Sequence, residues 1–138
     1  MTQINAYLTF NGNCREAMDF YAACLGGEIT FHTIGDSPLS DNMPEHMKQS
    51  ILHATLIKDS LLIMASDMVT EEGLIKGNSV SLMLNCSSEE ELKYSYEKLV
   101  EGGEATHPLE NTFWGSVFGD LIDKFGNHWL LNYDKNSN

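Results

Sequence analysis

Residues 25–30 read Leu-Gly-Gly-Glu-Ile-Thr, and residues 101–106 read Glu-Gly-Gly-Glu-Ala-Thr. Glycines in such a place end a helix, because glycine accepts the left-handed backbone of a helix C-terminus. Each glycine pair follows a stretch with apolar residues at helical spacing, and each of those stretches follows a strand pattern. The motif recurs at the same point in the same order of elements, which indicates a duplicated module. A solenoid needs at least three copies, so two copies predict one pseudo-symmetric domain.

The first module is predicted to cover about residues 3–67. Its strands are predicted at residues 4–10, 28–34, 49–57 and 61–66. Asn13, with Glu16 three residues later, predicts a capping box at the start of the helix. Residues 35–48 contain two prolines and are predicted to form a long irregular loop of the kind that often makes contacts.

The second module is predicted to cover about residues 78–134, after a linker over residues 67–78. Its strands are predicted at residues 79–84, 104–107, 115–122 and 128–133. Ser87 and Glu90 predict the helix cap in this module. Asp123 lies in the last hairpin turn, where aspartate commonly bonds backbone N–H groups, so we expect it to be structural.

The chain has 138 residues, of which 42% are hydrophobic, and this is ordinary for one globular domain. No apolar run approaches the roughly 20 residues that span a bilayer, and the N-terminus lacks the pattern of a signal peptide. A cytoplasmic protein is therefore expected. Cys14, Cys24 and Cys86 match neither a disulfide framework nor a metal-binding pair, and we expect structural thiols. Only Cys14, at a predicted helix N-terminus, has a position that can lower a thiol pKa.

The net charge is −12, from 20 acidic and 8 basic residues. Nucleic acids and anionic membranes are bound by clustered Lys and Arg, so neither is expected as a partner. The acidic residues are scattered along the chain, which is typical of a surface that promotes solubility. Attraction of a cationic ligand is the alternative role of this charge.

Short motifs spread over nearly the whole chain accompany the doubled element order. They are Tyr7-Leu8-Thr9-Phe10-Asn11-Gly12, Glu16-Ala17, Phe20-Tyr21, Gly26-Gly27-Glu28, His53-Ala54, Trp114-Gly115 and Asp123-Lys124-Phe125-Gly126-Asn127-His128-Trp129. Together they resemble the vicinal oxygen chelate superfamily of glyoxalases, bleomycin-resistance proteins and dioxygenases, and within it the PhnB-like branch. The resemblance implies an α+β fold in which two βαβββ modules form a curved, mostly antiparallel eight-stranded sheet around a cleft, with the helices outside. It also implies a homodimer.

Catalytic members of that superfamily bind a divalent metal in the cleft through His and Glu from the first and last strands of each module. In this sequence those positions correspond to Ala6, Met64, Ser79 or Val80, and Leu130. Neither they nor their neighbours supply a His, Asp or Glu, so we expect no tightly bound catalytic metal. His53, His128 and Asp67 are the nearest candidates for a relocated metal site, although a lone strand His is more often structural. No glycine-rich turn opens a helix, so no nucleotide-type cofactor is expected, nor the methyltransferase activity assigned to some similar sequences.

The predicted contacts of a small molecule are His53, Trp114, His128 and Asn132. His53 and His128 lie on strands and would meet if both strand faces point into the cleft. Trp114, with Trp129, is consistent either with a pocket wall or with core packing. The favoured function is metal-independent binding of a small, compact molecule by a homodimer. The alternatives are a divergent lyase, isomerase or dioxygenase that uses a relocated metal or His53 or His128 as acid or base, and an accessory protein that docks a partner through the cleft rim or residues 35–48.

Overall fold

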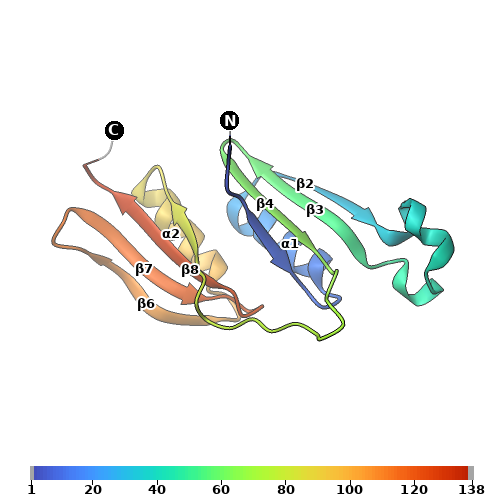
Figure 1. Cartoon of the computed structure of the whole chain (residues 1–138). Coiled ribbons are helices and arrows are strands. Elements are labelled where there is room, and N and C mark those ends of the chain that lie inside the picture. The colour runs from blue at the N-terminus through green and yellow to red at the C-terminus, as the bar shows by residue number, and fades with distance from the viewer. Residues whose placement is uncertain (1, 137–138) are drawn as a thin grey trace. The chain divides into compact units, whose positions relative to one another are not determined.

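The computed structural model describes residues 2–136, and the chain divides into two compact units, Met1–Ile75 and Lys76–Asn138. Each unit has the element order βαβββ (Figure 1), which confirms the α+β fold and the duplicated module. Each sheet has four strands of mixed but mostly antiparallel direction. The cleft and the single-domain organisation that the sequence predicts stay predictions.

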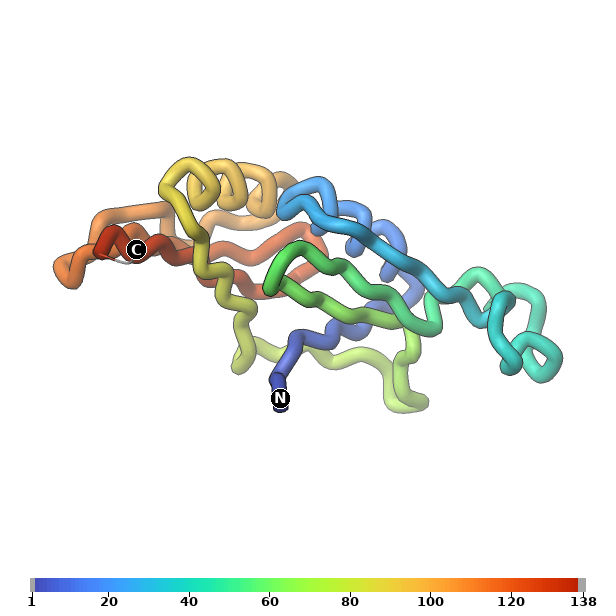
Figure 2. The backbone as a smooth tube through the Cα atoms, turned by 90° about the horizontal axis from the view of Figure 1, so that it is seen from above, coloured from blue at the N-terminus to red at the C-terminus, as the bar shows by residue number. Residues whose placement is uncertain are grey.

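The first unit contains one sheet, one helix and three short 3₁₀ helices. Its elements are β1 (Ala6–Thr9), α1 (Cys14–Leu25), β2 (Glu28–Thr33), η1 (Ile34–Asp36), η2 (Pro38–Asn42), η3 (Glu45–Met47), β3 (Ile51–Lys58) and β4 (Leu61–Ser66). The strand order is β1-β4-β3-β2, with β1 parallel to β4 and the other pairs antiparallel. Helix α1 lies on one face of this sheet (Figure 2).

The core of the first unit forms where α1 meets alternate residues of the central strands. The helix contributes Ala17, Met18, Tyr21 and Cys24, and the strands contribute Ala54, Leu56, Ile63 and Ala65, all of them buried. Because strand side chains alternate between faces, the residues between these point to the other face. That second face bears Tyr7, His53 and Met64, and we call it the open face of the first sheet, since α1 does not cover it.

The second unit repeats the arrangement of one sheet and one helix. Its elements are β5 (Leu82–Asn85), α2 (Glu89–Leu99), β6 (Glu104–Asn111), β7 (Ser116–Ile122) and β8 (His128–Asp134). The strand order is β5-β8-β7-β6, with β5 parallel to β8. Leu92 and Leu99 of α2 are fully buried, as are Leu121 and Leu131 of the sheet. The face of this sheet that α2 does not cover is the open face of the second sheet.

The predicted irregular loop is more ordered than expected, because residues 34–47 form the three consecutive 3₁₀ helices η1 to η3. Thr33 and Ser37 each cap one of them by accepting a backbone N–H bond through the side-chain oxygen. The segment projects beyond the end of its own sheet in Figures 1 and 2.

Both helix-cap predictions need correction. The side chain of Asn13 makes no capping hydrogen bond. In the second unit the cap is Ser88, which accepts from the N–H of Glu91, while the Glu91 carboxylate accepts from the N–H of Ser87. The predicted pair, Ser87 and Glu90, was therefore one residue too early, because consecutive serines offer the same local pattern twice.

The repeated glycines allow close approach between strands. A Cβ atom on Gly27 would lie 2.6 Å from the carbonyl oxygen of Ile57, and one on Gly103 would clash with the carbonyl oxygen of Ile122. Glu28 and Glu104, which follow the glycines, pair with the same two residues, Ile57 and Ile122. The duplicated motif is thus explained by the structure of the strand start.

Within the part of the chain described here, no helix has the length and apolar character needed to cross a membrane.

Candidate functional site

The open face of the second sheet combines apolar side chains with a small group of polar ones. Cross-strand partners point to the same face, so the pairing register defines its rows. One row is Met83, Leu130, Asp120 and His107, and the next is Asn85, Asn132, Phe118 and Glu110. His128 and Ile122 form a third pair. Leu130 and Phe118 are half-buried at the centre, so polar groups surround an apolar floor.

Two amides and two imidazoles border this floor. The Nδ2 of Asn132 donates to the Oδ1 of Asn85 at 3.2 Å, which leaves further donors and acceptors on both amides. His107 Nδ1 lies 2.9 and 3.0 Å from the two carboxylate oxygens of Asp120. Thr106 Oγ1 also donates to Asp120. His128 lies close enough for its charge to act on the same carboxylate.

Asp120 is held in its charged form. Partial burial alone would raise the pKa of its carboxyl group, but hydrogen bonds from Thr106 and His107, together with the charges of His107 and His128, lower the pKa overall. An ionised carboxylate can only accept hydrogen bonds. In the neutral form of His107 the proton that bonds to Asp120 is therefore on Nδ1, and Nε2 presents a lone pair.

The backbone around His107 is irregular on both sides. Two residues of β6 oppose one of β7 between Glu104 and His107, and again between His107 and Glu110, so a bulge flanks His107 in each direction. Pro108 follows directly and restricts His107 to extended backbone angles. Proline is tolerated here because β6 is an edge strand.

Two residues fix this irregular strand against β7. The hydroxyl of Tyr96 lies 3.0 Å from the carbonyl oxygens of both His107 and Asp120, to which it donates from the helix side. Burial, and then the charge of Asp120, raises the pKa of Tyr96, so the hydroxyl keeps its proton. Gly119 leaves room for the bulge, since a Cβ there would lie 2.9 Å from the carbonyl oxygen of His107.

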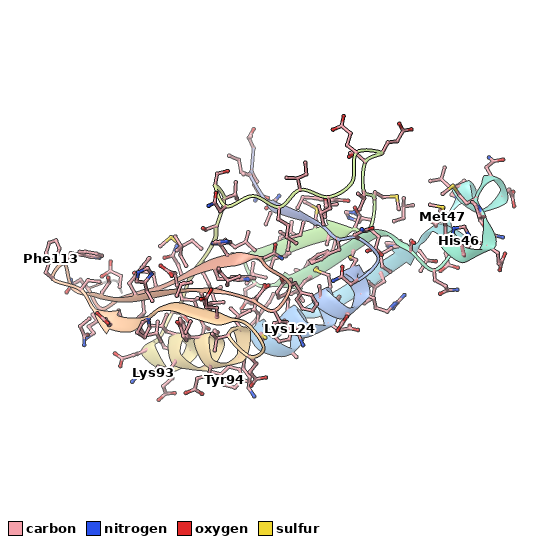
Figure 3. The ribbon with its side chains drawn as sticks, turned by 90° about the horizontal axis from the view of Figure 1, so that it is seen from below. His46, Met47, Lys93, Tyr94, Phe113 and Lys124 are labelled. Atoms are coloured by element: carbon pink, nitrogen blue, oxygen red, sulfur yellow. The ribbon has the colours of Figure 1, made fainter. Side chains whose placement is uncertain are left out.

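The predicted contact residues are distributed over several surfaces. His128 and Asn132 share the open face of the second sheet. Trp114 is 59% exposed in the β6–β7 turn, where its ring makes an edge contact with Phe113 at 4.9 Å between centroids. Figure 3 shows Phe113 at the tip of that hairpin. Trp129 is buried on the helix side of β8, so the two tryptophans do not form one wall.

His53 belongs to the open face of the first sheet. Its Nδ1 lies 3.4 Å from the hydroxyl of Tyr7, and it pairs with His32 across the β2–β3 ladder. Met64 lies beside Tyr7 in the β1–β4 register. This face therefore offers a phenol, an imidazole and a thioether as a second set of ligand contacts.

Asp67 and Asp123 have structural partners. Asp67 accepts backbone N–H bonds from Gly12 and Cys14 through Oδ1 and from Ile51 through Oδ2, at 2.9 to 3.0 Å. Asp123 accepts from two backbone N–H groups of its turn and from the indole N–H of Trp129 at 2.8 Å. The structural role predicted for Asp123 is confirmed. Asp67 is occupied in the same way, which leaves it poorly suited to a relocated metal site.

The positions expected to correspond to metal ligands need correction. Ala6 pairs with Ile63 on the helix side, whereas the residue beside Met64 is Tyr7. Ser79 and Val80 precede β5, and the partner of Leu130 is Met83. These residues do not fit a His and carboxylate metal set. Nowhere in residues 2–136 do three His, Cys, Asp or Glu side chains group closely enough to hold a metal ion.

The cysteines are buried free thiols. Burial, with the nearby charge of Asp67 as the second cause, raises the pKa of Cys14 to about 12. Burial and then Glu91 raise the pKa of Cys86 to about 12. Desolvation therefore outweighs any effect of the α1 dipole on Cys14, and both thiols stay protonated at neutral pH.

Sequence comparison decides the family. A model of the family described as 3-demethylubiquinone-9 3-methyltransferase matches residues 2–132. The chain belongs to this family. Protein YjdN of Escherichia coli K12 is 31% identical over 141 residues, which cover 96% of this chain and 95% of that protein.

Solved structures of similar proteins share this fold. Protein PA1353 of Pseudomonas aeruginosa shares 40% identity and a TM-score of 0.83, over 97% of this chain and 98% of that one. A putative 3-demethylubiquinone-9 3-methyltransferase, PhnB protein, of Bacillus cereus shares 26% identity and a TM-score of 0.73, over 96% and 99%. A glyoxalase/bleomycin resistance protein/dioxygenase superfamily member of Sphaerobacter thermophilus has the same fold at 21% identity, with a TM-score of 0.62 over 97% and 98%. The resemblance to the PhnB-like branch is confirmed.

His107 was not among the contact residues predicted from the sequence. Its carboxylate partner, Asp120, is 13 residues away, and its bulges depend on pairing with β7, so neither is visible in the local sequence. The one local signal that could have pointed to His107 is its place immediately before Pro108.

Proposed function

We propose that this protein binds a small, compact molecule on the open face of the second sheet, without a catalytic metal, and works as a cytoplasmic homodimer. One observation carries the proposal: an apolar floor of Leu130 and Phe118 is bordered by the amides of Asn85 and Asn132 and by the imidazole of His128. Ligand sites combine apolar surface with a few polar groups that fix orientation in this way.

The electrostatics favour a neutral or cationic ligand. The protein has a net charge of −12, and Asp120 and Glu110 lie on or beside the floor. An anionic ligand would meet like charges there, which costs binding free energy. The name of the bleomycin-resistance proteins suggests that those proteins sequester a small molecule. Sequestration of a neutral or cationic molecule by the present protein agrees with its negative charge.

A charge placed on the floor tests the proposal. We expect Leu130→Lys to weaken binding of the best ligand from a thermal-shift panel of neutral carbonyl compounds and small cations at least about tenfold, because the ligand would lose apolar contact and meet an ammonium group. Isothermal titration calorimetry measures the change.

Tyr94→Lys is the matched control. Tyr94 is 53% exposed on α2 and points away from the sheet in Figure 3, so binding should not change. The proposal would be contradicted if no compound of the panel raised the melting temperature of the wild-type protein, or if the wild type and Leu130→Lys bound the ligand with equal affinity.

A divergent lyase, isomerase or dioxygenase is the second candidate. The observation that favours acid–base chemistry is the carboxylate-bound imidazole of His107, rather than His53 or His128.

A further inference from the structure

We propose that His107 is a general base, positioned by Asp120, that removes a proton from a neutral carbonyl compound bound on the open face of the second sheet. The proposal rests on the ligand-binding function above and adds a reaction and a substrate class to it.

The first argument is the state of the imidazole. Asp120 engages Nδ1 of His107 through both carboxylate oxygens and is itself bonded by Thr106. With Nδ1 donating to a carboxylate, Nε2 presents its lone pair, and the carboxylate stabilises the imidazolium that forms when Nε2 takes a proton. The side chain of His107 is 77% exposed, so a substrate can reach Nε2.

The second argument is that several features of the fold position the exposed side chain of His107. A cross-strand His–Asp pair needs no bulge, and an exposed pair contributes little to stability. Here two bulges flank His107, and Tyr96 bonds the carbonyl groups of both His107 and Asp120. Gly119 leaves space for the displaced strand. Bulges are frequent beside active sites because they redirect a side chain, and positioning of this kind is what general-base catalysis requires.

The third argument identifies the substrate class. His107 lies in the same row of the face as Leu130, two strands or about 10 Å away, and Asn132 lies two residues further along β8, or about 7 Å. A ligand of a few carbon atoms on this floor reaches both a base and an amide donor. The nearby carboxylates of Asp120 and Glu110 disfavour anions.

The proton transfer is balanced within the substrate and His107. Nε2 takes a proton from the carbon beside the carbonyl group, the C–H electron pair forms a C=C bond, and the carbonyl π pair moves to oxygen. The enolate oxygen accepts a hydrogen bond from an amide such as Asn132. Return of a solvent-derived proton from Nε2 to carbon completes an exchange reaction, with no oxidant or other reactant.

Exchange of hydroxyacetone in D₂O, followed by proton NMR, tests the assignment. The wild-type protein should exchange the protons beside the carbonyl faster than an equal concentration of free imidazole. His107→Gln should lose about 100-fold in rate, the scale of general-base catalysis. His107→Ala should regain rate when imidazole is added, which a structural role would not produce.

Asp120→Asn should reduce the rate at least about tenfold and shift His107 from the Nδ1–H to the Nε2–H tautomer, as nitrogen NMR reports. His46→Gln is the matched control, because His46 is exposed on the segment 34–47 and has no carboxylate bond of this kind (Figure 3).

Three outcomes would overturn the assignment: equal exchange by the wild type and His107→Gln, an Nε2–H tautomer in the wild type, or exchange no faster than with free imidazole. If hydroxyacetone shifts the methyl NMR signals of Leu130 but its own protons do not exchange, the role of His107 as a base is contradicted and the binding function is supported. Absence of both effects contradicts the base and the binding of neutral carbonyl compounds together.

Discussion

Asp67 is the residue that ties three segments of the first unit together. Its carboxylate accepts N–H bonds from Gly12 and Cys14 at the start of α1 and from Ile51 at the start of β3. A negative charge at a helix N-terminus is also favourable to the helix dipole. Asp67 thereby takes over the capping role that the sequence assigned to Asn13, from a position more than fifty residues away.

We expect Asp67→Ala to lower the free energy of unfolding by about 3 kcal/mol, because three N–H groups lose a charged acceptor and two of the three bonds are partly buried. Asp67→Asn, which keeps one acceptor oxygen, should cost less. Urea denaturation followed by circular dichroism measures both. The exposed Asp41 is the control, and Asp41→Ala should change stability by less than about 0.5 kcal/mol. A loss below about 1 kcal/mol for Asp67→Ala would contradict this role.

At the scale of elements, the duplicated glycines determine how the chain passes from each helix into the strand that follows it. Gly102 and Gly103 bring β6 against the end of β7, as Gly26 and Gly27 bring β2 against the end of β3. At both Gly27 and Gly103 the nearest atom that a Cβ would meet is a backbone carbonyl oxygen, which cannot move aside by rotation of a side chain.

Gly103→Ala is therefore expected to destabilise the protein by about 2–3 kcal/mol, through overpacking against the carbonyl oxygen of Ile122. Gly73→Ala is the matched control. Gly73 has a φ of +87° but no heavy atom near the place of its Cβ, so only the backbone strain, about 1 kcal/mol, applies. Thermal unfolding compares the two variants, and equal losses would show that the contact with Ile122 is unimportant.

Local patterns predicted which elements exist better than where they begin. The helices and the order of strands follow from apolar spacing and glycine stops, which act within a few residues. The start of β5 was predicted near residue 79, whereas it lies at Leu82, because strand ends depend on the partner strand β8. Strand β6 extends to Asn111, beyond the predicted 104–107, since an edge strand tolerates Pro108. The His107–Asp120 pair required knowledge of the β6–β7 register and was not predicted.

At the scale of the whole molecule, apolar residues remain exposed on both units. Tyr7 and Ile57 are each about half exposed on the open face of the first sheet, and Met83 is 52% exposed on that of the second. Exposed apolar surface of this kind is common where proteins associate. It supports the homodimer that we propose, and it raises the question of how two strongly acidic chains come together.

Charge gives the homodimer a specific signature. Two chains that each carry a net charge of −12 repel one another, and this repulsion opposes association until salt screens it. The screening length falls from about 30 Å at 0.01 M salt to about 8 Å at 0.15 M, so the dimer should become tighter as NaCl is added. We expect the dissociation constant from analytical ultracentrifugation to fall at least about tenfold over this range, which corresponds to 1.4 kcal/mol. Sucrose, which adds no ions, is the control cosolute. A dimer that weakens with salt would mean that opposite charges join the chains, and a monomer at every salt and protein concentration would contradict the homodimer itself.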